Sequence, residues 1–256
     1  MTDGLPRLSD KLEPACAASL ASCWLPAPQA LDDGAGAGIS LAELDRALAG
    51  RELADWLPPE LSRAVRKRQL SFLGGRLCAE RALAALGLAD AAVGRMDGGA
   101  PLWPDGMLGS ITHHGEAAYV AAAPASAYAA LGMDSERLAR DSAAESIRTL
   151  CCTAFERESW LGDRADTLAE TLIFSAKEAG YKAIHRLAGR YVDFSEFEVR
   201  ELDWQSGRLT LAPTAKSALS GLMRPFAVRF RRAGDEVHTL VAEREPLDSL
   251  ADGLAR

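Results

Sequence analysis

The sequence predicts an α+β protein whose second half contains an antiparallel sheet. Between residues 197 and 241, apolar residues alternate with polar ones in short runs, and turns at Ser206-Gly207 and Ala233-Gly234-Asp235 separate the runs. A period of two indicates half-buried strands, and turns between such runs are typical of an antiparallel meander. After Thr167 the apolar residues instead recur at helical spacing. Helices and strands in separate blocks indicate the α+β class.

Length and composition limit the classes of protein to consider. At 256 residues the chain can form one large domain or two lobes, and we expect two lobes. No apolar run approaches the length that spans a bilayer, and the net charge of -7 argues against a general nucleic-acid binder. The N-terminus carries acidic residues and prolines where a signal peptide needs a basic start and an apolar core, so we expect a cytoplasmic protein. Five cysteines without paired spacing are expected to be reduced thiols: Cys16, Cys23, Cys78, Cys151 and Cys152.

The first half of the chain carries two helix signals. Ser40 and Glu43 form a capping-box pattern before a short helix from about Leu41 to Leu48, whereas residues 24 to 40 indicate a strand end followed by a loop. Residues 60 to 86 are expected to be largely helical, with a basic first half. Gly74 and Gly75 would each cost up to about 1 kcal/mol within this helix, so they indicate either a close helix contact or a nearby ligand.

Strands are predicted next. Residues 107 to 112 and 117 to 123 have the pattern of a hairpin, and residues 127 to 133 that of another strand. Asp134 and Glu136 follow, and two residues apart they would share a face if the extended conformation persists. Two neighbouring carboxylates repel each other, which makes a divalent cation a natural occupant. The alternative is an acidic strand end in solvent, and for so short a pattern alone this alternative is favoured.

The segment after Thr167 is expected to be the central helix of the protein. Thr167 and Glu170 have the spacing of a capping box, and shorter helices are expected over residues 142 to 150 and 153 to 161. Glu178 and Lys182 lie four residues apart and hence on one helix face, with Lys177 beside them. Alone, they could be a solvated surface ion pair.

Three motifs together resemble one family. GSITHH at residues 109 to 114, GMDSE at 132 to 136 and FSAKEAGYKA at 174 to 183 occur in the order found in the 4'-phosphopantetheinyl transferases of the large two-lobed type. The resemblance is closest to the enterobactin-type subgroup, because Gly75-Arg76 and the P-x-W-P-x-G segment from Pro101 to Gly106 also match it. It covers most of the chain.

This resemblance implies a fold and a reaction. The fold would be two similar α/β lobes related by a pseudo-twofold axis, with coenzyme A between them: an N-terminal lobe over residues 1-126, a C-terminal lobe over 127-245 and a tail over 246-256. The enzyme would be a monomer that transfers the phosphopantetheine arm of coenzyme A to a serine of an apo acyl or peptidyl carrier protein. It would require Mg²⁺ and release adenosine 3',5'-bisphosphate, and the subgroup favours secondary metabolism such as siderophore or polyketide biosynthesis.

The resemblance also implies residue roles. Asp134, Glu136 and Glu178 match the metal-binding acids, Glu178 also matches the proposed base, and Lys182 matches a catalytic lysine near the phosphates. The residues implied to bind coenzyme A, besides Lys182, are Arg68, Arg76, Thr112, His113 and Lys177.

The sequence departs from the family in two places. Gly99 and Ala100 stand where relatives often have a basic residue, so one coenzyme A contact is either absent or supplied elsewhere. Ser135 replaces an aliphatic residue, and no loss of metal is expected from this change. A non-catalytic coenzyme A-binding regulatory protein is the alternative function. A different transferase or a kinase is a second alternative, although no P-loop motif is present.

Overall fold

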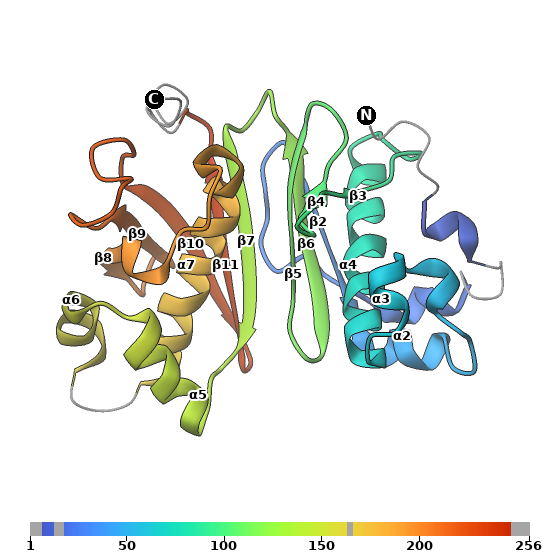
Figure 1. The fold of residues 1–256 in the computed structure, drawn as a ribbon, viewed down its shortest axis with the longest axis horizontal. Coiled ribbons are helices and arrows are strands. Elements are labelled where there is room, and N and C mark those ends of the chain that lie inside the picture. The colour runs from blue at the N-terminus through green and yellow to red at the C-terminus, as the bar shows by residue number, and fades with distance from the viewer. Residues whose placement is uncertain (1–6, 13–17, 163–165, 247–256) are drawn as a thin grey trace. The chain divides into compact units, whose positions relative to one another are not determined.

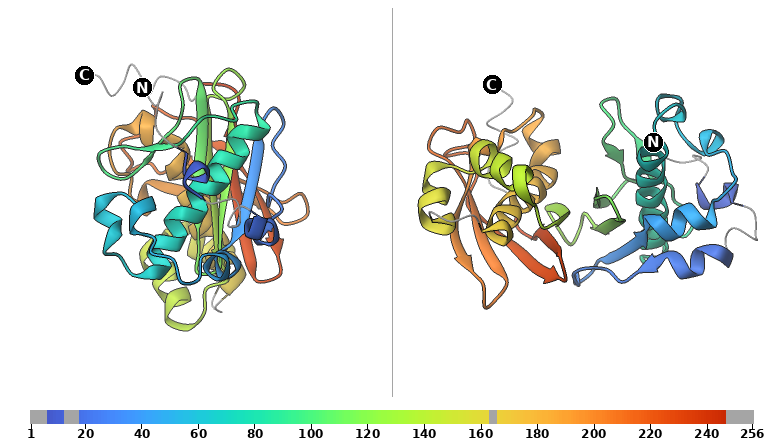
Figure 2. Two further views of the ribbon diagram at one scale, coloured as in Figure 1. Left: turned by 90° about the vertical axis from the view of Figure 1, so that its right-hand side faces the viewer. Right: turned by 90° about the horizontal axis from the view of Figure 1, so that it is seen from below.

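The computed structural model describes residues 7-12, 18-162 and 166-246. The chain divides into two compact units, Met1-Ala125 and Ser126-Arg256. In each unit a long helix packs on an antiparallel sheet, which confirms the predicted α+β class (Figures 1 and 2). The predicted tail and Cys16 lie outside the described residues, apart from the first residue of that tail. Among the described residues, no helix is long and apolar enough to cross a membrane.

The first unit contains a four-stranded sheet in the order β1-β2-β6-β5, with every neighbour antiparallel. The predicted hairpin is β5 and β6. The loop expected before Ser40 instead contains strand β2, which was missed because the strand consists mainly of Ala and Gly. Its elements are β1 (Trp24-Leu25), β2 (Ala35-Ser40), α2 (Leu41-Ala47), α3 (Pro59-Ser62), α4 (Arg66-Ala85), β3 (Gly94-Arg95), β4 (Pro101-Leu102), β5 (Met107-His113) and β6 (Ala117-Pro124), with 3-10 turns at Ser9-Lys11, Leu20-Cys23 and Ala54-Trp56.

Helix α4 packs on β2 and β6, and its two glycines lie close to side chains of α2, β2, β6 and β5. A Cβ atom at Gly74 would lie 2.8 Å from Leu41 Cδ2, and one at Gly75 would lie 2.7 Å from Ile111 Cγ2. Of the two explanations for these glycines, the structure therefore supports close packing. The helix expected from residue 60 to residue 86 is interrupted over residues 63-65, so that α3 and α4 are separate.

The second unit contains a five-stranded sheet in the order β7-β11-β10-β9-β8, again antiparallel throughout. This confirms the predicted meander and adds β7 beside its last strand. Its elements are β7 (Ala130-Arg137), α5 (Asp141-Ser146), α6 (Ala154-Glu156), α7 (Thr167-Ala188), β8 (Phe197-Asp203), β9 (Arg208-Pro213), β10 (Phe226-Ala233) and β11 (Glu236-Glu243), with π-helical turns at Ile147-Cys151 and Arg157-Leu161 and a 3-10 turn at Phe194-Glu196.

Helix α7 crosses β7 and β11 and carries the face on which the acidic residues lie (Figure 1). It is capped by Asp166, whose side chain accepts hydrogen bonds from the amides of Leu168 and Ala169, and not by Thr167 as the spacing predicted. A Cβ atom at Gly132 would lie 2.1 Å from the Ala179 carbonyl oxygen, so only glycine lets β7 approach the helix this closely.

Candidate functional site

The acidic cluster lies between β7 and α7. Strand β7 continues through the GMDSE motif, since Asp134 pairs with Thr239 and Glu136 with Val237 on β11. Side chains two residues apart share a face of a strand, so both carboxylates lie on the face that Gly132 presents to α7. The predicted persistence of the extended conformation is therefore confirmed.

Asp134 is held by two side chains of α7. Its carboxylate is 2% exposed; Oδ1 accepts a hydrogen bond from Lys182 Nζ at 2.5 Å and Oδ2 accepts one from Ser175 Oγ at 2.9 Å. The Lys182 side chain is 25% exposed, so the ammonium group is partly open to solvent. The ion pair of Lys182 is thus made with Asp134, whereas the helical spacing alone suggested Glu178.

Burial disfavours the ionised forms of the other two carboxylates, Glu136 and Glu178. The pKa of Glu136 is raised to about 8, chiefly by burial and also by the negative charges of Asp134 and Glu178, whereas Lys182 lowers it. Burial also raises the pKa of Glu178, against the lowering effect of Lys182. Neighbouring carboxylates away from water repel one another, which favours the binding of a cation between them. A carboxylate with a raised pKa is also a stronger base near neutral pH.

The donor set fits a magnesium ion that is bound together with a phosphate-bearing substrate. Among the residues that the structure describes, no three His, Cys, Asp or Glu side chains are placed to hold a metal ion by themselves. Magnesium, however, usually takes one or two carboxylates, several waters and the oxygens of a substrate phosphate. Asp134 and Glu136 supply the carboxylate oxygens, and a nearby cation would lower the pKa of Glu136, which burial raises.

Lys177 lies in the interior of the second unit. It is 1% exposed, and its ammonium group donates to Glu156 Oε2 at 2.7 Å, the Cys151 carbonyl at 2.8 Å and the Phe194 carbonyl at 3.0 Å. An ammonium group has three N-H bonds, and these contacts use all of them. The resemblance implied that Lys177 contacts coenzyme A. In the structure its ammonium group instead pairs with Glu156 in the core of the second unit.

An aromatic slot adjoins Glu178. Tyr181 and Tyr191 approach each other with ring centroids 5.7 Å apart, and Phe194 joins them in lining a hollow of about 40 Å³. Tyr191 is 64% exposed, so one side of the slot faces solvent. The rings provide the apolar surroundings that disfavour the ionised form of Glu178.

In the first unit, two residues predicted to bind coenzyme A, His113 and Arg68, contact each other. Arg68 Nη1 donates to His113 Nε2 at 3.0 Å, and both side chains are exposed. Thr112 is 3% exposed and, as the preceding residue of β5, projects to the opposite face. His114, the next residue, is 9% exposed, and its Nδ1 accepts from the Glu116 amide at 3.3 Å.

Arg76 lines a separate cavity of about 280 Å³ in the first unit. It is 8% exposed, its guanidinium lies 5.0 Å from the centre of the Phe72 ring, and its Nη1 has no hydrogen-bond partner. Burial, with the nearby charge of Arg95, lowers the pKa of Arg76 to about 10. A buried cationic N-H without a partner favours an anionic ligand.

Sequence reasoning missed Arg95, which lines the same cavity. A Cβ atom at Gly99 would lie 3.0 Å from Arg95 Nη2, so this guanidinium occupies the space beside the glycine. The basic group that seemed absent at Gly99 and Ala100 is thus present four residues before Gly99. In the sequence, Arg95 is a lone arginine before a Gly-rich turn, and this pattern is too common to identify a site.

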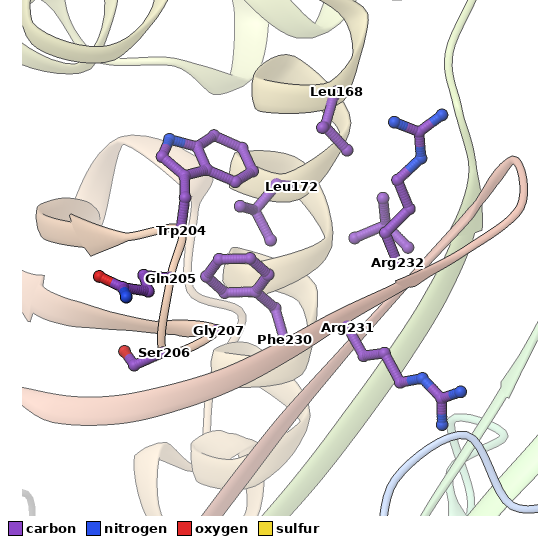
Figure 3. Close-up of a pocket in the computed structure, with 10 residues that line it drawn as sticks. Leu168, Leu172, Trp204, Gln205, Ser206, Gly207, Phe230, Arg231 and Arg232 are labelled. Atoms are coloured by element: carbon purple, nitrogen blue, oxygen red, sulfur yellow. The ribbon is translucent and has the colours of Figure 1, made fainter.

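A further hollow, of about 400 Å³, lies against the opening turns of α7 (Figure 3). Leu168, Leu172, Trp204 and Phe230 form its apolar wall, and the Trp204 and Phe230 rings meet edge to face at 5.5 Å. Among the residues that the structure describes, its lining contains no acidic, cysteine or histidine side chain. The hollow therefore offers no group for acid-base or metal chemistry.

Comparison with known proteins agrees with this arrangement. Residues 57-123 match the 4'-phosphopantetheinyl transferase N-terminal domain, and residues 130-236 match the 4'-phosphopantetheinyl transferase superfamily. The first match contains Arg68, Arg76 and His113, and the second contains the whole β7-α7 cluster.

Individual relatives are similar over two thirds or more of their own length. The chain is 36% identical over 155 residues to 4'-phosphopantetheinyl transferase Npt of Nocardia iowensis, which covers 59% of this chain and 68% of Npt. It is 31% identical over 168 residues to 4'-phosphopantetheinyl transferase PptT of Mycobacterium tuberculosis, covering 64% of this chain and 73% of PptT. It is 33% identical over 196 residues to enterobactin synthase component D of Salmonella typhi, which covers 73% of this chain and 78% of that protein. The chain therefore belongs to the 4'-phosphopantetheinyl transferase superfamily of enzymes, as the three motifs predicted.

Proposed function

We propose that this protein transfers the 4'-phosphopantetheine arm of coenzyme A to a serine hydroxyl of an apo carrier protein. The observation that carries the proposal is the acidic cluster of the buried Asp134 and the half-buried Glu136 and Glu178, with Lys182 at its edge. The raised pKa values of the two glutamates favour a cation and a proton acceptor in one place. Membership of the superfamily supports the reaction type.

In the proposed reaction, the serine oxygen bonds to the phosphorus that bears the pantetheine arm. The bond from that phosphorus to the bridging oxygen breaks, and adenosine 3',5'-bisphosphate leaves with the electron pair. The serine proton passes to the Glu178 carboxylate, whose raised pKa suits it to act as a base. Lys182 supplies positive charge to the pyrophosphate oxygens as the bond breaks.

Magnesium is the proposed metal, with Asp134, Glu136 and Glu178 as its protein ligands. When bound, it would neutralise charge on the pyrophosphate. The three residues supply the hard oxygen ligands that Mg²⁺ prefers, and the substrate supplies the remaining oxygens. The proton on Glu136 must leave before that carboxylate can act as a ligand.

The basic residues of the first unit are proposed to bind the anionic nucleotide end of coenzyme A. Arg76 offers an unpartnered N-H in a cavity shared with Arg95, and Arg68, hydrogen-bonded to His113, is a second, exposed basic group. Thr112 is retained as a proposed backbone or hydroxyl contact at the same strand. Lys177 is not part of this proposal, because its three N-H groups are already used.

The proposed partners are acyl or peptidyl carrier domains, and we propose that the enzyme acts as a cytoplasmic monomer. Peptidyl carriers of siderophore assembly are the first to test, because the chain resembles enterobactin synthase component D over 73% of its length. Nucleic acid is not a proposed partner, since the net charge is -7.

Intact-mass spectrometry of the carrier tests the proposal directly. The protein is incubated with coenzyme A, Mg²⁺ and a panel of apo acyl and peptidyl carriers, with Asp134→Ala and excess chelator as controls. One or more carriers should gain the mass of a phosphopantetheine group, and both controls should abolish the gain. Binding of coenzyme A without a mass change in any carrier would instead support the regulatory alternative.

A further inference from the structure

We propose that Ser175 and Thr239 are positioning residues that fix the orientation of the Asp134 carboxylate, and this inference depends on the function proposed above. The three side chains form a continuous hydrogen-bonded chain between α7, β11 and β7. Asp134 Oδ2 lies 2.9 Å from Ser175 Oγ, and Ser175 Oγ lies 2.9 Å from Thr239 Oγ1. Asp134 is 2% exposed and both hydroxyl residues are 0% exposed, so water does not compete for these contacts.

Counting protons gives the chain a direction. Thr239 Oγ1 donates its single proton to the Ser175 carbonyl at 2.9 Å and can share it with Ser175 Oγ. A carboxylate oxygen accepts hydrogen bonds, and Asp134 Oδ1 accepts one from Lys182 at 2.5 Å. Ser175 must therefore donate its own proton to Asp134. If Ser175 donated to Thr239 instead, two acceptors would face each other at 2.9 Å without a proton between them.

This donation matters because the carboxylate has little intrinsic orientation. The terminal torsion of an aspartate is broad, so its hydrogen-bond partners decide which way the oxygens point. Lys182 is a long, partly exposed side chain and is the group proposed to meet the phosphates. Ser175, by contrast, is fixed in the core by Thr239. The Ser175 contact is thus the one that holds Asp134 while Lys182 interacts with the substrate.

The local alternatives for these hydroxyls are not used. A serine within a helix commonly donates to the carbonyl four residues before it, as Thr171 does here to the Thr167 carbonyl. Ser175 donates across to β7 instead, and Thr239 donates to the helix backbone at Ser175. Both hydroxyls therefore couple the helix that carries Glu178 to the strand that carries Asp134.

The test measures metal affinity without turnover. Mn²⁺ is titrated into the protein with coenzyme A present and carrier absent, and free Mn²⁺ is followed by electron paramagnetic resonance. Loss of an outer partner of a metal ligand typically costs 10- to 100-fold in affinity, so Ser175→Ala should weaken Mn²⁺ binding by about that factor. Thr239→Val should weaken it less, and Thr239→Ser, which keeps the hydroxyl, should restore the parental affinity.

Ser217→Ala is the matched control. Ser217 is 6% exposed and its hydroxyl donates to Glu196 at 2.9 Å, a similar contact with a carboxylate that is paired with Arg190. This variant should lower the melting temperature and leave Mn²⁺ affinity unchanged. Parental Mn²⁺ affinity in Ser175→Ala would overturn the proposal, since the hydroxyl would then be only structural. If Ser175→Ala does not fold, an equal affinity in Thr239→Val and Thr239→Ser overturns it.

The outcome is distinguishable from a failure of the proposed function. If the parental protein binds Mn²⁺ with coenzyme A but modifies no carrier, the transfer reaction is wrong, and the comparison of affinities still decides the role of Ser175. If Asp134→Ala binds Mn²⁺ like the parent, Asp134 is not a ligand and the positioning role is overturned with it.

Discussion

Replacing Lys177 with methionine should destabilise the second unit rather than weaken coenzyme A binding. Lys177 and Glu156 are 1% and 0% exposed and lie 2.7 Å apart. Removing one partner of such a pair leaves an uncompensated buried charge, which typically costs about 3 to 5 kcal/mol. The amides of Thr153 and Val199 still donate to Glu156, each at 2.7 Å, so the lower end of that range is expected.

This loss of stability is large enough to measure by thermal unfolding. For a unit that runs from Ser126 to Arg256, each kcal/mol corresponds to roughly 3 to 5 °C, so a loss of about 3 kcal/mol should lower the melting temperature by about 9 to 15 °C. The Michaelis constant for coenzyme A, measured well below the transition, should stay near its parental value. Lys216→Met is the control, because Lys216 is an exposed lysine of the same unit.

A double variant separates the buried charge from the lost packing. In Lys177→Met with Glu156→Gln, no ionised group remains in the pair, so part of the lost stability should return. The reasoning is refuted if Lys177→Met melts within about 2 °C of the parent and needs far more coenzyme A for half-maximal rate. Lys177 would then reach the substrate, as the resemblance implied.

Three further predictions concern the reaction. Glu178→Gln should lower single-turnover transfer by about 10² to 10⁴ while coenzyme A still binds with Mg²⁺, and near-parental transfer would remove Glu178 from catalysis. The pKa of Glu136 is raised from 4.5 to about 8, so metal binding in the presence of coenzyme A should release a proton and tighten between pH 7 and 9, as calorimetry in several buffers can show. The folded state holds this proton longer than the unfolded state, so stability of the metal-free protein should fall as pH rises from about 4.5 to about 8. Glu136→Gln should reduce that slope in urea unfolding and leave the part due to Glu178, whose pKa is also raised. Arg76→Ala and Arg95→Ala should each raise the coenzyme A concentration needed for half-maximal rate, with Arg95→Lys closer to the parent, whereas an unchanged concentration dependence would separate this cavity from the nucleotide.

The sequence predicted the elements whose signal is local. Alternation of apolar residues found the hairpin of β5 and β6 and the meander of β8 to β11, because a period of two depends only on neighbours along the chain. Local spacing also predicted that Asp134 and Glu136 share a face. Strand β2 was missed because Ala35 to Ser40 consists mainly of small residues that carry no alternation. The family resemblance came from motif order, which no single motif could establish.

Tertiary structure decided which residue of each motif meets which partner. Lys177 and Lys182 stand five residues apart on α7, yet one is paired in the core with Glu156 and the other with Asp134. His113 is exposed and His114 is buried, although the two are neighbours in one motif. Helical and strand periods fix which side chains share a face, but burial depends on the surface packed against that face. Those surfaces come from residues distant in the sequence, so only the folded chain could separate a structural lysine from a lysine of the site.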